Sequence, residues 1–131
     1  MDQLKDLTRA EEEVMMALWK RGPSFVKDLL EEYEEPRPAY NTVSTITRIL
    51  QKKGFVGHES FGKSHQYFPL VSKDDYREYA LHKLVSGYFD GAPMKVVEYF
   101  AENEMIPELT LRKGKSKKKD SGEEEQLDLF Q

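Results

Sequence analysis

The sequence predicts a mainly α-helical fold with one small β-hairpin. Residues 40–53 place apolar side chains at steps of three and four, the spacing of an amphipathic helix. Residues 55–60 and 65–70 are rich in aromatic and β-compatible side chains, and Gly62 between them can take the positive φ of a tight turn. A helix followed at once by such a hairpin is typical of a winged helix-turn-helix domain, in which the helix enters a DNA groove and the hairpin, or wing, contacts the backbone.

Two helices and a connector are expected before this helix. Thr8 followed by Glu11 forms a capping-box pattern at the start of the first helix, which Gly22 ends. Ser24 fits the N-cap of the second helix. The Pro-Arg-Pro sequence at residues 36–38 cannot continue a helix, so the next helix begins after it.

The outward face of the helix at residues 40–53 carries short polar side chains and no acid. An exposed helix face without a binding function is usually filled with Glu and Lys, whereas short polar groups let a helix approach another surface closely. We therefore predict that this face contacts double-stranded DNA, with Arg48 and Asn41 reading base edges. The predicted DNA-binding residues are Asn41, Thr42, Ser44, Thr45, Arg48, Lys52 and, at the wing tip, Lys63.

The net charge of −4 does not argue against nucleic acid, because the charges are unevenly distributed. Residues 37–68 carry five basic side chains and one acidic side chain, whereas residues 1–36 carry five basic and ten acidic. Residues 69–131 carry ten basic and thirteen acidic side chains. Screening over roughly 8 Å at physiological salt hides distant acids from a docked phosphate, so the local basic excess favours DNA.

Two further helices are expected beyond the wing. Ser72 caps the first, Gly91 ends it, and Pro93 begins the second. Their aromatic and aliphatic stripe is broader than one winged helix needs, which indicates a homodimer surface; the alternative is that they pack on their own domain. The predicted dimerisation residues are Tyr76, Tyr79, Leu84, Tyr88, Val96, Val97 and Phe100.

Composition changes again near the C-terminus. We divide the chain into a winged-helix DNA-binding domain at residues 1–71, a helical dimerisation region at 72–106 and a disordered charged tail at 107–131. The lysines of residues 113–119 either add phosphate contacts of no sequence preference or only keep the tail soluble.

The composition also excludes several classes of site. The absence of cysteine removes disulfides, thiolate metal sites and cysteine catalysis. The three histidines, His58, His65 and His82, have neither a nucleophile arrangement nor metal-ligand spacing, and we interpret them as ordinary surface or core histidines. We therefore expect a protein that is not an enzyme and that uses no metal or cofactor. No apolar run is long enough for a membrane span and no signal-peptide pattern follows Met1, so we expect a cytoplasmic location.

Three segments follow one another in the order and spacing of a known family. The helix PAYNTVSTITRILQKKGFV, the wing end YFPLVSKDDY and the later VVEYFAENE resemble the BlaI/MecI family, which includes penicillinase and methicillin-resistance repressors, over about residues 7–103. This resemblance implies an N-terminal winged helix and a helical C-terminal region that forms a homodimer. It also implies repression through operator dyads, and release when a membrane-bound sensor protease triggers cleavage in the dimerisation helices.

The resemblance carries over to individual positions. It places Asn41, Thr42, Ser44, Thr45 and Arg48 on the recognition helix and Lys63 at the wing tip. The Asn-Phe bond that is cut in penicillinase-type members corresponds to Tyr99 and Phe100, so the residue before the cut differs. The lysine-rich tail replaces the last dimerisation helix of the family, and the lack of cysteine excludes its copper-responsive branch.

The C-terminal residues resemble a different motif, the QLxLF peptide by which many bacterial replication and repair proteins bind the sliding clamp. A short apolar anchor on a flexible acidic tether suits a hydrophobic pocket. The alternative function is a protein-binding adaptor that docks on the clamp through Gln126, Leu127, Asp128, Leu129 and Phe130.

Overall fold

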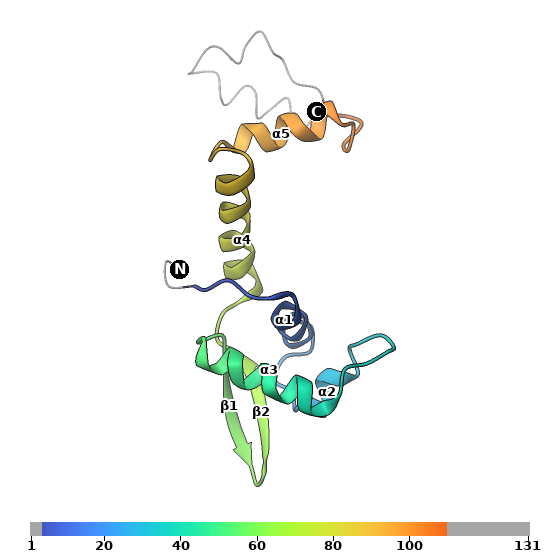
Figure 1. The fold of residues 1–131 in the computed structure, drawn as a ribbon, viewed down its shortest axis with the longest axis vertical. Coiled ribbons are helices and arrows are strands. Elements are labelled where there is room, and N and C mark those ends of the chain that lie inside the picture. The colour runs from blue at the N-terminus through green and yellow to red at the C-terminus, as the bar shows by residue number, and fades with distance from the viewer. Residues whose placement is uncertain (1–3, 110–131) are drawn as a thin grey trace. The chain divides into compact units, whose positions relative to one another are not determined.

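The structure is a computed structural model, and it describes residues 4–109 of the 131-residue chain. Its elements are α1 (Arg9–Arg21), α2 (Val26–Leu30), α3 (Tyr40–Lys52), β1 (Val56–Phe61), β2 (Ser64–Pro69), α4 (Lys73–Tyr88) and α5 (Pro93–Glu102) (Figure 1). This order of three helices, an antiparallel hairpin and two more helices is the predicted winged-helix arrangement. The chain divides into two compact units, Met1–Ala80 and Leu81–Gln131, which are described separately.

Helix α1 begins at the predicted capping box and supplies much of the core of the first unit. Thr8 Oγ1 accepts a hydrogen bond from the Glu11 backbone N–H at 3.2 Å, and the Thr8 N–H donates to Glu11 Oε1 at 2.9 Å. Gly22, at φ 85°, ends the helix by donating its N–H to the Leu18 carbonyl. The buried apolar stripe of the helix comprises Val14, Met15, Ala17 and Leu18.

Ser24 pairs with the wing instead of capping α2, so the predicted N-cap is wrong. Ser24 is buried, and its backbone exchanges two hydrogen bonds with Tyr67 of β2, at 2.9 and 2.8 Å. The N-cap of α2 is Phe25, whose N–H donates to Asp28 Oδ2 at 3.0 Å. A long-range backbone pairing has thus overridden the local preference of serine for a cap.

Helix α3 ends in a Schellman motif that turns the chain into the wing. Gly54 has a φ of 86°, and its N–H donates to the Gln51 carbonyl. The N–H of the next residue, Phe55, donates to the Leu50 carbonyl, and the Phe55 side chain is buried against the core. The motif therefore fixes both the end of α3 and the direction in which β1 leaves it.

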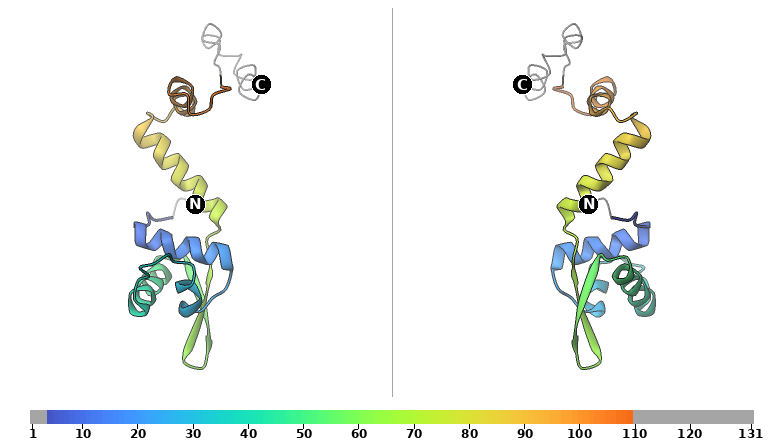
Figure 2. Two further views of the ribbon diagram at one scale, coloured as in Figure 1. Left: turned by 90° about the vertical axis from the view of Figure 1, so that its right-hand side faces the viewer. Right: turned by 90° about the vertical axis from the view of Figure 1, so that its left-hand side faces the viewer.

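The wing is a hairpin with a two-residue turn. Val56 pairs with Pro69 at the base and Phe61 with Ser64 at the tip, leaving Gly62 and Lys63 as the turn, with Gly62 at φ 64°. Strand β1 begins one residue later than predicted, because Phe55 belongs to the helix-ending motif. Strand β2 begins one residue earlier than predicted, because Ser64 pairs with Phe61. In both side views the hairpin extends beyond the helices of the first unit (Figure 2).

The first turns of α4 complete the core of the first unit. Ser72 caps this helix as predicted, because its Oγ accepts the Asp75 N–H at 3.0 Å. The Tyr76 ring is buried, lies 5.7 Å from the Phe55 ring centroid, and accepts the Leu7 N–H at its hydroxyl. The core therefore depends on residues from both sides of the wing.

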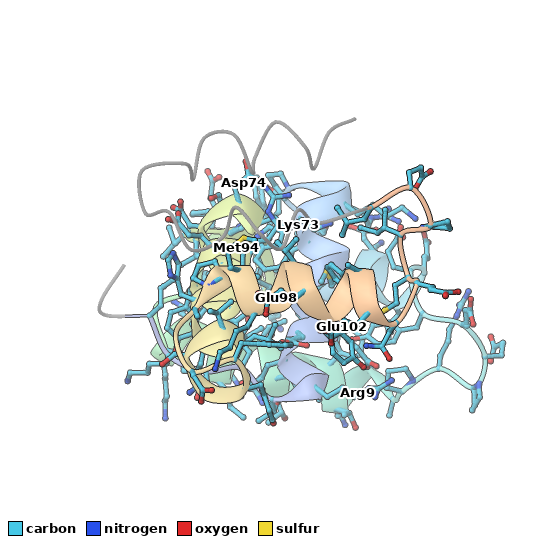
Figure 3. The ribbon with its side chains drawn as sticks, turned by 90° about the horizontal axis from the view of Figure 1, so that it is seen from above. Arg9, Lys73, Asp74, Met94, Glu98 and Glu102 are labelled. Atoms are coloured by element: carbon cyan, nitrogen blue, oxygen red, sulfur yellow. The ribbon has the colours of Figure 1, made fainter. Side chains whose placement is uncertain are left out.

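The second unit contains the end of α4 and all of α5. Pro93 begins α5 as predicted, and no residue of that helix is buried. Met94, Glu98 and Glu102 follow one another along α5 at four-residue steps (Figure 3). Within residues 4–109, none of the helices combines the length and the apolar character that a membrane span requires.

A partly buried ion pair joins the start of α1 to the end of α3. Lys53 Nζ donates to Glu11 Oε1 at 2.7 Å and to the Asp6 carbonyl at 3.2 Å, and only 7% of the Glu11 side chain is exposed. Burial raises the pKa of the Glu11 carboxyl, but the hydrogen bonds from Lys53 and Thr8 outweigh it, so the pKa lies below the ordinary value of 4.5. The Glu11 carboxylate therefore stabilises the fold above the pKa that it has in the unfolded chain.

This contribution is lost in acid, because the unfolded state binds the proton more readily than the folded state. We expect the free energy of unfolding to fall as the pH drops from 4.5 through the lower folded pKa. Glu11→Gln should cost about 1.5–3 kcal/mol at pH 7, since it removes a charged hydrogen-bond partner, and should flatten the acid side of the profile.

Urea unfolding at fixed protein concentration from pH 3 to 7 measures both effects. Glu13→Gln, a change at an exposed position of the same helix, is the matched control and should leave the profile unchanged. If the free energy of unfolding of Glu11→Gln falls with pH in parallel with that of the wild type, Glu11 is not the source of the loss of stability in acid.

Candidate nucleic-acid interface

The predicted polar face of α3 lies on the surface of the first unit. Asn41, Thr42, Thr45 and Lys52 are exposed, and Ser44 is half-buried. On the opposite side of the helix, Val43, Thr47 and Leu50 have no exposed surface. The helix is therefore divided as its sequence predicts, into an apolar back and a polar front that another molecule can approach.

Arg48 is held over this face by two hydroxyl groups of its own helix. Its Nη1 donates to Ser44 Oγ at 2.9 Å and its Nη2 donates to Thr45 Oγ1 at 3.3 Å. Both acceptors are neutral, and in residues 4–109 no carboxylate forms an ion pair with Arg48. The guanidinium therefore keeps its full charge in a restricted orientation, and Ser44 and Thr45 act as its positioning groups.

A cleft of about 330 Å³ separates α3 from the wing. Arg48 and Gln51 line it from the helix, and Lys63 and two histidines line it from the hairpin. No lining residue is acidic, so the cleft favours an anion. The complete lining is Val26, Tyr40, Ser44, Arg48, Gln51, His58, Lys63, Ser64, His65 and Tyr67.

A second cleft of about 290 Å³ shares several of these residues and extends to α2. Lys27 and Tyr40 line it, and Tyr40 is 54% exposed. Phe61 closes it by an edge contact to Phe25, with ring centroids 5.8 Å apart. Sequence reasoning missed Lys27, Tyr40 and His65 as parts of this surface. For Tyr40, its position directly before Asn41 at the start of α3 is the signal from which it could have been predicted.

A larger cleft on another side of the first unit does not suit a phosphate. It measures about 960 Å³, and Glu12, Glu13, Glu32 and Glu34 contribute four acids to its lining. Arg9 and Lys20 also line it, but they form ion pairs with Glu13 and Glu32. The electrostatics therefore favour the cleft beside Arg48 over this larger one.

The basic excess of residues 37–68 divides into two groups. Lys53 pairs with Glu11 on the back of α3, and Arg37 pairs with Glu35 at 3.4 Å. The second group, Arg48, Lys52 and Lys63, has no ion-pair partner in the described part of the chain. The cationic charge of the interface therefore comes from Arg48, Lys52 and Lys63.

The predicted dimerisation residues fall into both units. Tyr76 is buried in the first unit, and Tyr79 is half-buried there and donates its hydroxyl to Asp6 Oδ1 at 2.5 Å. These two rings therefore pack on their own domain, which is the alternative to a homodimer surface that the sequence left open. In the second unit, Leu84 and Tyr88 are exposed by 44% and 80%. The remaining three, Val96, Val97 and Phe100, are half-buried.

Two other predictions concern the C-terminal part of the chain. The candidate cleavage pair lies within α5, with Tyr99 48% exposed and Phe100 half-buried. The Tyr99 ring touches Phe89, with centroids 6.1 Å apart. The proposed clamp-binding residues, Gln126 to Phe130, and the lysines of residues 113–119 lie outside the described residues.

Comparisons with known proteins identify relatives of this chain. It is 28% identical over 107 residues to the penicillinase repressor of Bacillus licheniformis, covering 81% of this chain and 84% of that protein. It is 27% identical over 100 residues to the methicillin resistance regulatory protein MecI of Mammaliicoccus sciuri, covering 76% and 81%. The solution structure of monomeric Bacillus licheniformis BlaI in complex with the blaP half-operator is 27% identical, with a TM-score of 0.46, and the match covers 56% of this chain and 90% of that chain.

A family model agrees with these relatives. The model described as penicillinase repressor matches residues 7–113, which is most of the chain. The chain therefore belongs to the penicillinase repressor (BlaI/MecI) family, whose members are winged-helix DNA-binding transcriptional repressors and not enzymes.

Proposed function

We propose that this protein is a dimeric, sequence-specific repressor that binds an operator dyad through α3 and the wing. The observation that carries this proposal is the acid-free polar front of α3, on which two hydroxyls hold Arg48 beside the basic wing tip. An α-helix fits the major groove of B-DNA, and short side chains let its backbone approach the base edges. Membership in a repressor family supports the same function.

Arg48 is the residue best suited to read a base. A guanidinium has five N–H groups, and the two hydroxyl contacts of Arg48 use one on each terminal nitrogen. One N–H on each of these nitrogens remains for a bidentate contact to the O6 and N7 of a guanine. Asn41, about two turns nearer the start of α3, is suited to an adenine, while Lys52 and Lys63 contact phosphates.

The second unit supplies the surface for dimerisation. The exposed apolar side chains Leu81, Leu84 and Tyr88 lie on α4 within this unit, and α5 buries none of its residues in the single chain. Apolar surface of this kind is typical of an interface with a second copy. Two linked winged helices bind two half-sites with an effective concentration that a monomer lacks.

The same unit suits release by proteolysis in response to a membrane-bound sensor protease. The Tyr99–Phe100 bond lies in a helix that no buried side chain anchors, so local opening costs little free energy. Cleavage there removes the rest of α5 from the dimer surface and lowers the affinity for the dyad. The tyrosine before the bond requires a protease whose pocket accepts an aromatic ring.

Selection of duplexes from a random DNA library by the full chain tests the function. We expect an enriched inverted repeat whose half-site centres lie about 10 base pairs apart or a multiple of this, since two α3 helices must enter grooves on one side of the duplex. Recovery of no preferred sequence contradicts specific recognition. Enrichment of a single half-site contradicts the dimer.

Arg48→Ala should weaken binding to the selected duplex by about 1–3 kcal/mol through loss of a bidentate base contact. Fluorescence anisotropy with the selected and a scrambled duplex measures the effect, and the preference between the two should fall. Arg77→Ala removes an exposed arginine that pairs with Asp74, and this matched control should change neither affinity. An Arg48→Ala variant that keeps the wild-type preference would rule out base reading by this side chain.

Lys63→Ala should weaken binding to all sequences alike, because a phosphate contact carries no base information. The slope of log K against log salt should become less steep by about 0.9, the value of one phosphate contact on B-DNA. Lys20→Ala, at an exposed lysine that pairs with Glu32 at 3.0 Å, is the control. A salt slope that stays at the wild-type value would show that the wing tip does not contact the backbone.

A further inference from the structure

Two histidines of the wing stack on each other in the cleft beside Arg48. The ring centroids of His58 and His65 lie 4.2 Å apart, and their planes differ by 13°. In the strand register His58 is opposite Tyr67, and His65 is opposite Ser60, so the two imidazoles are diagonal neighbours on one face of the hairpin. His58 is half-buried between the strands and α3, and His65 is exposed.

Helix α3 fixes the orientation of the inner ring. His58 Nδ1 lies 3.0 Å from Gln51 Oε1. Because an amide oxygen only accepts hydrogen bonds, this contact places a hydrogen on Nδ1 and leaves Nε2 for a further partner. The Gln51 contact therefore holds one imidazole nitrogen of His58, while His65 is exposed and lines the cleft.

The charged and titratable groups around this pair are cationic or neutral. From α3, Arg48 and Tyr40 line the same cleft, and from the wing Lys63 and Tyr67 line it. From α2, Lys27 lines the adjoining cleft, which His65 also lines. The carboxylate of Glu59, the neighbour of His58 along β1, belongs to the opposite face of the hairpin, since successive side chains of a strand alternate.

We propose that the stacked His58–His65 pair is a proton-dependent phosphate-binding site, which holds the DNA backbone between α3 and the tip of the wing. This inference rests on the proposed function, and its ligand is a phosphodiester group of duplex DNA. No acidic side chain lines the cleft. A bound phosphate supplies the negative charge that an acid would supply, so it favours the charged imidazole in the complex. Two positive charges in stacked rings repel each other strongly, so the pair takes up one proton per chain.

Uptake of a proton makes the affinity depend on pH. Histidine changes its charge between about pH 5 and 8, and one proton taken up on binding changes the affinity by up to about tenfold per pH unit. The protonated pair adds one ionic phosphate contact, which steepens the salt slope by about 0.9. A pair that only shapes the wing by packing would change neither quantity.

The test uses the full chain and a 30-base-pair duplex of random sequence, because a phosphate contact needs no particular base. Fluorescence anisotropy at constant ionic strength gives Kd at pH 6, 7 and 8. We expect wild-type binding to be about three- to tenfold tighter at pH 6 than at pH 8, the change that an average uptake of about a quarter to a half of a proton gives over two pH units. His58→Phe/His65→Phe keeps two stacked rings and should lose this difference, with its circular dichroism melting curve confirming the fold.

Two further variants make the result specific to the pair. His82→Gln removes the third histidine of the chain, which lies in α4, and should keep the wild-type pH dependence. His65→Lys supplies a permanent charge at the exposed position. This variant should bind at pH 8 as tightly as the wild type binds at pH 6, with little change between these pH values.

The outcomes separate this inference from the proposed function. A wild-type chain that binds the duplex with no pH dependence overturns the inference alone. The same conclusion follows if the double phenylalanine variant keeps the wild-type dependence. A chain that binds neither this duplex nor any selected one overturns the proposed function, and the phosphate site with it.

Discussion

The burial of one side of α3 by its neighbours is the constraint on which the interface depends. Val43 and Leu50 have no exposed surface and belong to one core with Val14 and Leu18 of α1 and Leu29 of α2. Each such side chain contributes about 1.5–3 kcal/mol by leaving water, so together they fix the rotation of α3 about its axis. A shift of one residue turns a helix by about 100°, which would expose Val43 and turn the polar front toward the core.

Polar groups on the back of α3 make this rotation more specific than apolar packing alone. Thr47 is fully buried, and its hydroxyl donates to the Ser44 carbonyl at 2.7 Å. At the end of the helix, Lys53 reaches Glu11 and so connects α3 to the capping box of α1. A buried charge without its partner costs free energy, so the Lys53–Glu11 pair penalises other orientations of the helix. The Thr47 hydrogen bond lies within α3 and satisfies the buried hydroxyl. Because Glu11 pairs with Lys53 on the back of the helix, it does not neutralise the cations on the front of α3.

Local patterns in the sequence were enough to predict most elements but not their long-range pairings. The capping box at Thr8, the positive φ of Gly62 and the polar front of α3 each depend on residues within a few positions, so the sequence predicts them. Ser24 shows the opposite case, since its partner Tyr67 lies in a strand that is distant in sequence. The stacking of His58 on His65 likewise depends on the hairpin register, which a shift of one residue changes. Periodicity was enough to predict the polar front of α3, whereas the cleft that borders it could not be predicted in this way.

The charge of the interface explains why one winged helix alone is poorly suited to tight binding. Arg48, Lys52 and Lys63 are the cations of α3 and the wing that no acid in residues 4–109 pairs with. Because Arg48 is proposed to read a base, Lys52 and Lys63 are left for phosphates. Each phosphate contact on B-DNA contributes through counterion release, and two such contacts supply only a small part of what a protein with about six to ten contacts obtains. Two ways of increasing this number are compatible with the sequence of the interface. A second copy doubles the set of contacts, and a protonated histidine pair adds one contact per chain without a further lysine. Both leave the acid-free front of α3 unchanged, so affinity can be adjusted without altering the side chains that we propose to read the bases.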